Sequence, residues 1–105
     1  YFKNVRTFPH MPVHHYGCTV NLAWAATGKL AGHVTMGKLW DVAAGWALNT
    51  AAGRAFYTAD TGEKIETMDG FLQQNWKLKE VIFVCQTHQV ENLKGKFMTR
   101  KELKL

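Results

Sequence analysis

The sequence predicts an α/β protein, a layered sheet with flanking helices, and three observations support this fold class. Stretches rich in helix formers alternate with short β-branched or apolar runs. Glycines follow the helical stretches, where they are expected to end a helix. The unbroken apolar run VIFVC, residues 81–85, is typical of a strand buried on both faces. We expect the order helix, strand, helix, strand, strand, helix, and a partly parallel sheet.

The first half of the chain predicts two helices and one strand. CTVNLAWAA, residues 18–26, is rich in helix formers, and Gly28 supplies its stop. HVTM, residues 33–36, is short and β-branched enough for a strand. DVAAGWALNTAAG predicts a helix from Asp41 to Gly53, whose many small residues would let its backbone approach a neighbouring layer closely. Asp41 is the expected N-cap, because its carboxylate can accept from free backbone amides.

The second half is less regular. RAFYT, residues 54–58, predicts a strand, and ADTGEK, residues 59–64, predicts a turn. Residues 65–79 show no clean period, so we assign them no element. After the apolar strand, residues 86–98 predict an amphipathic helix. Its apolar positions are three and four apart, at Val90, Leu93 and Phe97.

Three segments follow from this pattern. Residues 1–16 contain Pro9 and Pro12 and predict an extended lead-in arm that lies against another part of the protein. Residues 17–98 form the expected globular lobe, and residues 99–105 form a basic tail. A chain of 105 residues has room for one small domain or for half of a larger one.

Composition indicates a soluble globular protein. Hydrophobic residues make up 47% and charged residues 20%, which predicts a packed core. No apolar stretch is long enough for a membrane-spanning helix. Cys18 and Cys85 show no CxxC spacing, so we expect a reducing compartment. Because the first residue is Tyr1, we expect a processed product, a fragment or one half of a larger protein.

The net charge of +5 is concentrated near the end of the chain. Such a segment can bind nucleic acid, acidic protein or anionic lipid. The alternative is a solvated helix end, where cations complement the helix dipole. Against the single acid Glu102 stand five basic residues: Lys94, Lys96, Arg100, Lys101 and Lys104.

Several kinds of chemistry are poorly supported. The sequence contains no serine, which excludes a serine nucleophile on this chain, and it has neither a GxGxxG nor a P-loop motif. His10, His14, His15 and Cys18 could bind zinc or supply a cysteine nucleophile with its base. Their spacing matches no standard zinc finger, and prolines interrupt it. Loop histidines beside one buried thiol are the favoured interpretation.

One motif points to a known family. The run GKLWDVAAGWALNTAAG resembles the second signature of the inositol monophosphatase family: an aromatic residue, Asp, any residue, Ala-Ala-Gly, an apolar stretch and a closing glycine. The likeness extends over about residues 16–98, through an ATG turn upstream and a closing strand and helix downstream. The positions that carry it are Trp40, Asp41, Val42, Ala43, Ala44, Gly45, Ala47, Leu48 and Gly53.

The resemblance implies the C-terminal lobe of a two-lobed phosphomonoesterase with alternating α and β layers. Two or three Mg²⁺ ions would lie between the lobes, and Asp41 would ligate one of them while metal-activated water attacks phosphorus. Amides near Gly17 and Cys18 would face the substrate phosphate or hydroxyls. Thr35 stands where relatives often place a glutamate that binds a substrate hydroxyl.

The same comparison reveals departures. Relatives take most metal ligands from an N-terminal lobe, and this chain has no such carboxylate cluster, so alone it should be inactive. Asn49 and Arg54 replace an apolar and a small residue of the motif. Three hypotheses stay open: a phosphatase lobe completed by a missing N-terminal lobe or another protein chain, a catalytically dead homologue serving as a structural subunit, and a small nucleic-acid-binding module.

Overall fold

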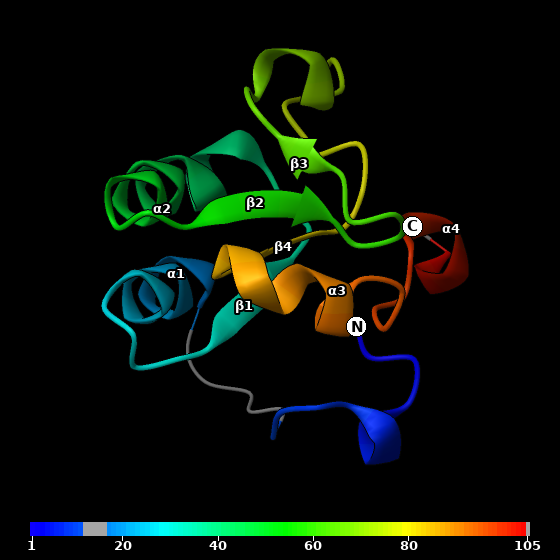
Figure 1. Ribbon diagram of the computed structural model, residues 1–105. Coiled ribbons are helices and arrows are strands. Elements are labelled where there is room, and N and C mark those ends of the chain that lie inside the picture. The colour runs from blue at the N-terminus through cyan, green and yellow to red at the C-terminus, as the bar shows by residue number, and fades with distance from the viewer. Residues whose placement is uncertain (12–16, 105) are drawn as a thin grey trace.

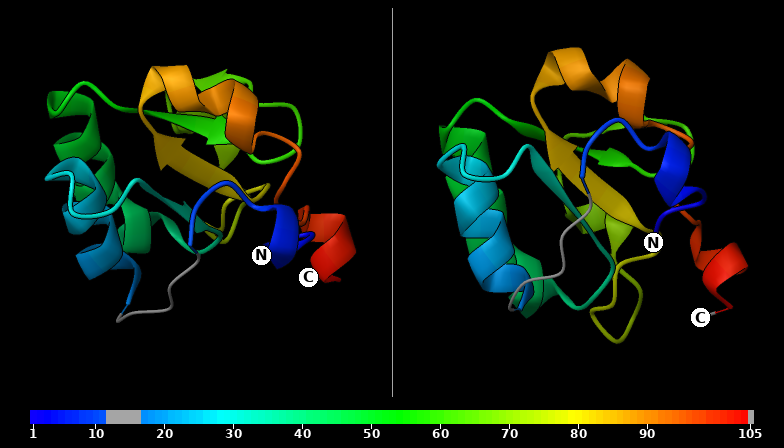
Figure 2. Two further views of the ribbon diagram at one scale, coloured as in Figure 1. Left: turned by 60° about the horizontal axis from the view of Figure 1, so that its bottom comes forward. Right: turned by 90° about the horizontal axis from the view of Figure 1, so that it is seen from below.

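The computed structural model describes residues 1–11 and 17–104, and these form three layers (Figures 1 and 2). Helices α1 (Cys18–Ala26) and α2 (Leu39–Ala51) lie side by side over one face of a sheet. The first residues of the chain and the short helix α3 (Val90–Leu93) cover the other face. The predicted α/β fold with flanking helices is therefore confirmed.

The sheet has four described strands: β1 (Gly32–Thr35), β2 (Ala55–Thr58), β3 (Lys64–Ile65) and β4 (Ile82–Cys85). Their order is β1-β4-β2-β3, and each pairing is antiparallel, so the expectation of a partly parallel sheet is wrong. The reason is strand order. β1 and β2, joined through α2, do run in the same direction, but β4 lies between them and opposes both.

The two long helices approach each other closely at Gly45. A Cβ atom on this residue would lie 2.5 Å from Cβ of Leu22, so α1 leaves no room for a side chain there. Buried Asn49 adds a polar link, because its Nδ2 donates to the carbonyl oxygens of Leu22 at 3.0 Å and Gly45 at 2.8 Å. Gly28 and Gly53 follow the helix ends with φ of 83° and 81°, as predicted.

Two apolar cores lie on opposite faces of the sheet. All four residues of β4 are buried, which confirms the predicted doubly covered strand. The helix-side core consists of Leu22, Ala25, Val42, Phe56, Ile65, Leu78, Ile82 and Val84. The arm-side core consists of Tyr57, Ala59, Val81, Phe83, Cys85, Val90, Leu93 and Phe97.

The N-terminal arm packs on the arm-side core. Phe2 forms an antiparallel backbone bridge with Phe97, and the ring of Phe8 lies 5.4 Å from that of Phe97. The arm includes one 3-10 turn, η1 (Val5–Thr7). Residues 12–16 of the predicted arm lie outside the described residues.

The expected helix over residues 86–98 is wrong in length. The chain forms a 3-10 turn, η3 (Thr87–Gln89), and then α3, which ends after one turn. Gly95 explains the end: it takes φ of 75°, and its N–H donates to the carbonyl of Ala59 at 3.0 Å. This bond ties the chain to the end of β2, away from the helix axis.

The segment between β3 and β4 includes η2 (Asp69–Phe71) and a turn at Trp76, which has a φ of 65°. Backbone bonds join this segment to the start of α2. The N–H of Leu39 donates to the carbonyl of Trp76 at 2.8 Å, and the N–H of Leu78 donates to the carbonyl of Gly37 at 2.8 Å. A segment without periodicity therefore fixes where a helix begins.

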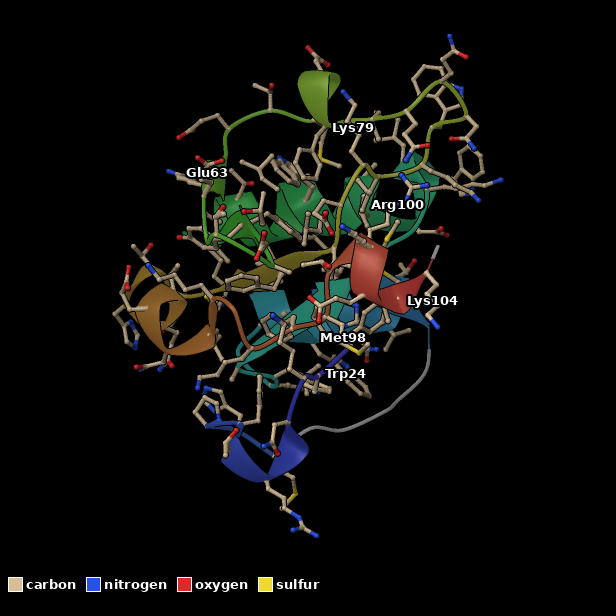
Figure 3. The ribbon with its side chains drawn as sticks, turned by 90° about the vertical axis from the view of Figure 1, so that its right-hand side faces the viewer. Trp24, Glu63, Lys79, Met98, Arg100 and Lys104 are labelled. Carbon is tan, nitrogen blue, oxygen red and sulfur yellow. The ribbon has the colours of Figure 1, made fainter. Side chains whose placement is uncertain are left out.

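The tail continues into a short helix, α4 (Arg100–Leu103), seen with Arg100 and Lys104 in Figure 3. The hydroxyl of Thr99 accepts from the N–H of Glu102 at 3.2 Å, and the Glu102 carboxylate lies 3.4 Å from Nζ of Lys3. The tail thus meets the arm. None of the described helices is long and apolar enough to cross a membrane.

Candidate functional site

Asp41, the predicted metal ligand, lies in the first turn of α2 and not at its N-cap, so the expected capping position is wrong. The helix begins at Leu39, because backbone pairing with the segment around Trp76 fixes the chain two residues earlier. Asp41 still provides a hydrogen-bond acceptor for a free backbone amide at the helix start, because its Oδ2 accepts from the N–H of Lys38 at 3.2 Å. The residue is exposed, and its carboxylate is available to a ligand.

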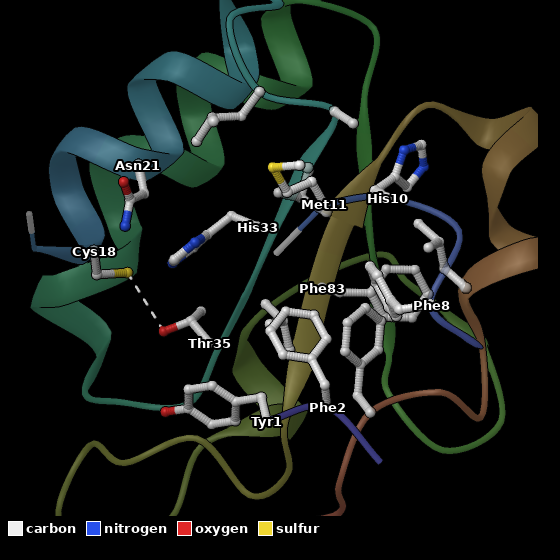
Figure 4. A pocket seen from close by; sticks show the side chains of 17 residues that line it. Tyr1, Phe2, Phe8, His10, Met11, Cys18, Asn21, His33, Thr35 and Phe83 are labelled. Carbon is white, nitrogen blue, oxygen red and sulfur yellow. Dashed lines mark hydrogen bonds between the residues drawn. The ribbon is translucent and has the colours of Figure 1, made fainter. Parts of the chain in front are cut away.

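The other predicted site residues meet where α1 begins and β1 ends. Gly17 is the N-cap of α1, and no side chain caps the helix there. Cys18 opens the helix, and its Sγ lies 3.5 Å from Oγ1 of Thr35, as Figure 4 shows. Asp41 contributes to the electrostatic environment of Cys18. The structure therefore gathers Gly17, Cys18 and Thr35, with Asp41 near enough to influence the thiol.

The Cys18 thiol and the His33 imidazole are both uncharged at neutral pH. Burial raises the pKa of the Cys18 thiol, the Thr35 hydrogen bond opposes that rise, and the Asp41 charge adds to it. Burial lowers the pKa of His33 to about 4. A protonated thiol is a poor nucleophile, so the environment disfavours cysteine catalysis by Cys18.

A cavity of about 290 Å³ lies between the arm and β1, and we call it the apolar cavity. Figure 4 shows Cys18, Thr35 and His33 on one side of it and the rings of Phe2 and Phe8 on the other. Most of its lining side chains are aliphatic or aromatic, which suits an apolar group with one or two hydrogen-bonding atoms.

A second cavity, of about 310 Å³, lies at the start of α2, and we call it the basic cavity. Asp41 lines this cavity, Cys18 and Thr35 line the apolar cavity, and Gly17 lines neither. The sequence did not predict the three cations of the basic cavity, Lys38, Lys77 and Arg100, because they come from segments far apart in the chain. The only signal was the excess of basic residues. The lining residues are Met36, Gly37, Lys38, Asp41, Lys77 and Arg100.

The histidine and cysteine grouping does not form a site within the described residues. Nε2 of His10 lies 3.4 Å from Oε1 of Gln89, and Cys18 pairs with Thr35 instead. His14 and His15 lie outside the described residues. Across residues 1–11 and 17–104, no three His, Cys, Asp or Glu residues gather as metal ligands.

The residues around Asp41 bear on the magnesium site that the motif implies. Mg²⁺ requires an octahedral set of hard oxygen ligands and is usually held by more than one anionic group. The lining of the basic cavity offers one carboxylate, Asp41, among three cationic side chains that repel a divalent cation. These residues by themselves do not fit a magnesium ion.

Comparison with known proteins adds one finding. Residues 2–91 match the sequence model of the inositol monophosphatase family. Members of this family generally depend on a metal and act on phosphomonoesters. Neither the curated proteins nor the solved structures contain a significant match. The family match covers most of the chain and includes each of the predicted site residues: Gly17, Cys18, Thr35 and Asp41.

Proposed function

Because the chain belongs to the inositol monophosphatase family, we propose that it is the C-terminal lobe of a magnesium-dependent phosphomonoesterase. The observation that carries this proposal is the placement of Asp41 on the first turn of α2. One carboxylate oxygen is held by the N–H of Lys38 at 3.2 Å, which fixes the side chain. The other oxygen accepts no hydrogen bond from a described residue and can bind a metal.

The proposal requires further ligands from outside this lobe. One carboxylate leaves Mg²⁺ mostly hydrated and weakly bound. A second lobe, in the same polypeptide or on another protein chain, would supply the remaining carboxylates and outweigh the nearby cations. Two or three ions would then be shared between the lobes. The isolated lobe is accordingly inactive.

Gly17, Cys18 and Thr35 are the proposed substrate contacts. The first amides of α1 have no partner within the helix, so they can donate to a phosphate or hydroxyl oxygen. Thr35 can exchange its contact with Cys18 for a substrate hydroxyl. A neutral threonine binds such a hydroxyl without the charge of a glutamate, so we expect a substrate other than inositol phosphate.

A catalytically dead homologue that serves as a structural subunit is the second candidate. Asn49 and Arg54 depart from the family motif, and both make structural bonds here: Asn49 links the helices, and Nη1 of Arg54 donates to the carbonyl of Ala26 at 3.2 Å. Trp40 and Trp76 are 62% and 55% exposed. Exposed indoles of this kind favour a partner that covers them.

Reconstitution separates the two candidates. The chain would be combined with the lobe that carries the remaining carboxylates, and hydrolysis of an aryl phosphate would be followed with and without Mg²⁺. The phosphatase proposal expects metal-dependent turnover that Asp41→Asn abolishes. Undiminished turnover in that variant would contradict the role of Asp41. A stable complex that lacks turnover and covers the two indoles would support the structural subunit.

A further inference from the structure

The basic cavity carries positive charge that the described residues do not neutralise. Three cations against one carboxylate leave a surplus of two positive charges around about 310 Å³. Within the described residues, no ion pair involves Lys38, Lys77, Arg100 or Asp41. The carboxylates of Asp41 and Glu80 accept from backbone amides instead. Two of the three positive charges therefore have no counter-charge among the lining residues.

The backbone holds two of these cations together. Lys38 and Lys77 face each other in an antiparallel bridge, and backbone hydrogen bonds flank them on both sides. Like charges directly opposite each other in such a pair are unfavourable without an anion between them. Both lysines line the basic cavity, and Nζ of Lys38 lies over the Trp40 ring, 4.9 Å from its centroid, rather than against a carboxylate.

Arg100 supplies the third cation from α4, as Figure 3 shows. Its backbone N–H donates to Oε1 of Glu80 at 2.7 Å, which fixes the start of the helix. One side of its guanidinium contacts the side-chain amide of Gln73. Its Nε is buried and has no hydrogen-bond partner among the described residues. A buried donor without a partner is unfavourable and points to a missing acceptor.

We propose that the basic cavity binds the phosphate group of a small molecule through Lys38, Lys77 and Arg100, without a metal ion. A guanidinium and two ammonium groups match a tetrahedral dianion, and charge-assisted hydrogen bonds of this kind are strong. The volume of about 310 Å³ is at the lower end of the range for small-molecule sites. This proposal goes beyond the phosphatase function, because it requires neither a metal nor a second lobe.

The test is a titration of the 105-residue chain with inorganic phosphate, in EDTA and at constant ionic strength. Amide chemical shifts are followed by NMR. We expect saturable shifts centred on Gly37, Lys77 and Arg100. Arg100→Gln should weaken binding by about tenfold, because it removes a charged donor. Lys77→Gln, at a more exposed position, should weaken binding by about threefold.

Two matched controls make the same charge change outside the cavity. Nζ of Lys79 donates to the carbonyl of Gly70 at 3.0 Å, and Lys101 is exposed on α4. Lys79→Gln and Lys101→Gln should retain phosphate affinity within about twofold. Their amide spectra, and those of Lys77→Gln and Arg100→Gln, report whether each variant is folded.

Asp41→Asn separates this proposal from the phosphatase function. Removing its negative charge should strengthen phosphate binding by roughly two- to fivefold, whereas the same variant should abolish hydrolysis by a reconstituted enzyme. Phosphate binding without turnover in the reconstituted protein would contradict only the phosphatase function. Turnover without phosphate binding by the isolated chain would contradict only the basic cavity.

Four results would overturn the proposal. These are shifts that do not saturate, equal shifts with chloride, control variants that lose as much affinity as Arg100→Gln, and binding of duplex DNA with no response to free phosphate. The last result would identify the cations as a surface for nucleic acid, whose affinity falls steeply with salt.

Discussion

The two faces of the sheet are covered in different ways. On the helix side, α1 and α2 pack so closely that Gly45 has no room for a Cβ atom, and Asn49 bonds across the contact. On the arm side, a short N-terminal segment and one turn of α3 do the covering, and a cavity of about 290 Å³ persists beside β1. The helix side holds the lobe together, while the arm side leaves space for a ligand.

The difference shows how a small lobe can combine rigidity with a cavity. The rigid side orients the starts of α1 and α2, and these carry Cys18 and Asp41. On the arm side, the apolar cavity borders β1, the strand that ends at Thr35. Variants on the two sides should therefore differ in their effect on stability.

The largest expected effect is at Gly45. Gly45→Val should destabilise the chain by about 3 kcal/mol, because the new side chain would overlap Leu22. Ala44→Val, one residue away on the exposed side of α2, is the control and should cost about 0.5 kcal/mol. Urea unfolding measures both. Equal effects would show that the helix side is no more tightly packed than the surface.

The second effect concerns pH and His33, which lines the apolar cavity at β1. Its folded pKa of about 4 is below the ordinary value of 6.5, so between these values the unfolded chain binds a proton that the folded chain does not. Stability should be complete above pH 6.5 and fall by up to about 3 kcal/mol as the pH decreases towards 4.

Unfolding at pH 7 and pH 5 in wild type and His33→Gln provides the measurement. The variant should lose most of this pH dependence. His88→Gln, at an exposed histidine, should keep it. An unchanged dependence in His33→Gln would assign the titration to other groups.

Asn49→Ala should have an intermediate effect. It removes two buried hydrogen bonds, to Leu22 and Gly45, and leaves a small void, so we expect a loss of about 2 kcal/mol. Thr50→Ala, at the adjacent exposed position, is the matched control. If both variants unfold at the same urea concentration, the polar link between the helices does not contribute to stability.

Phe8→Ala should have the smallest effect. The ring is half-buried against Phe97, so its removal should cost about 1 kcal/mol, less than a change on the helix side. The comparison variant is Arg6→Ala at an exposed position of the same arm. A loss as large as that of Gly45→Val would mean that the arm side carries as much of the stability.

Sequence reasoning succeeded where the signal is local. Gly28 and Gly53 end the two long helices because a left-handed residue is needed there, and glycine adopts that conformation without strain. The apolar run of β4 predicted a strand with both faces covered, and all four of its residues are buried. The small residues of α2 predicted a close approach of its backbone to a neighbouring layer, and the close approach at Gly45 is to Leu22 of α1, within the same layer.

The errors arose where distant segments decide the outcome. Asp41 lies inside the first turn because the segment around Trp76 pairs with the start of α2. The helix after β4 is short because Gly95 bonds to Ala59. The basic cavity could not be predicted, since Lys38, Lys77 and Arg100 meet only after β4 and α4 are in place. No periodicity within one segment encodes such contacts.

The position of β4 between β1 and β2 also has a consequence for how the chain folds during synthesis. Both strands take β4 as their antiparallel partner, and β4 is not made until residue 85 has been added. Until then, β1 has no neighbouring described strand, and β2 can pair only with the two residues of β3. The helices can form earlier, but the sheet beneath them must wait until β4 has been synthesised. A ribosome-bound chain truncated before β4 should therefore expose the apolar sides of α1 and α2 and be a substrate for chaperones.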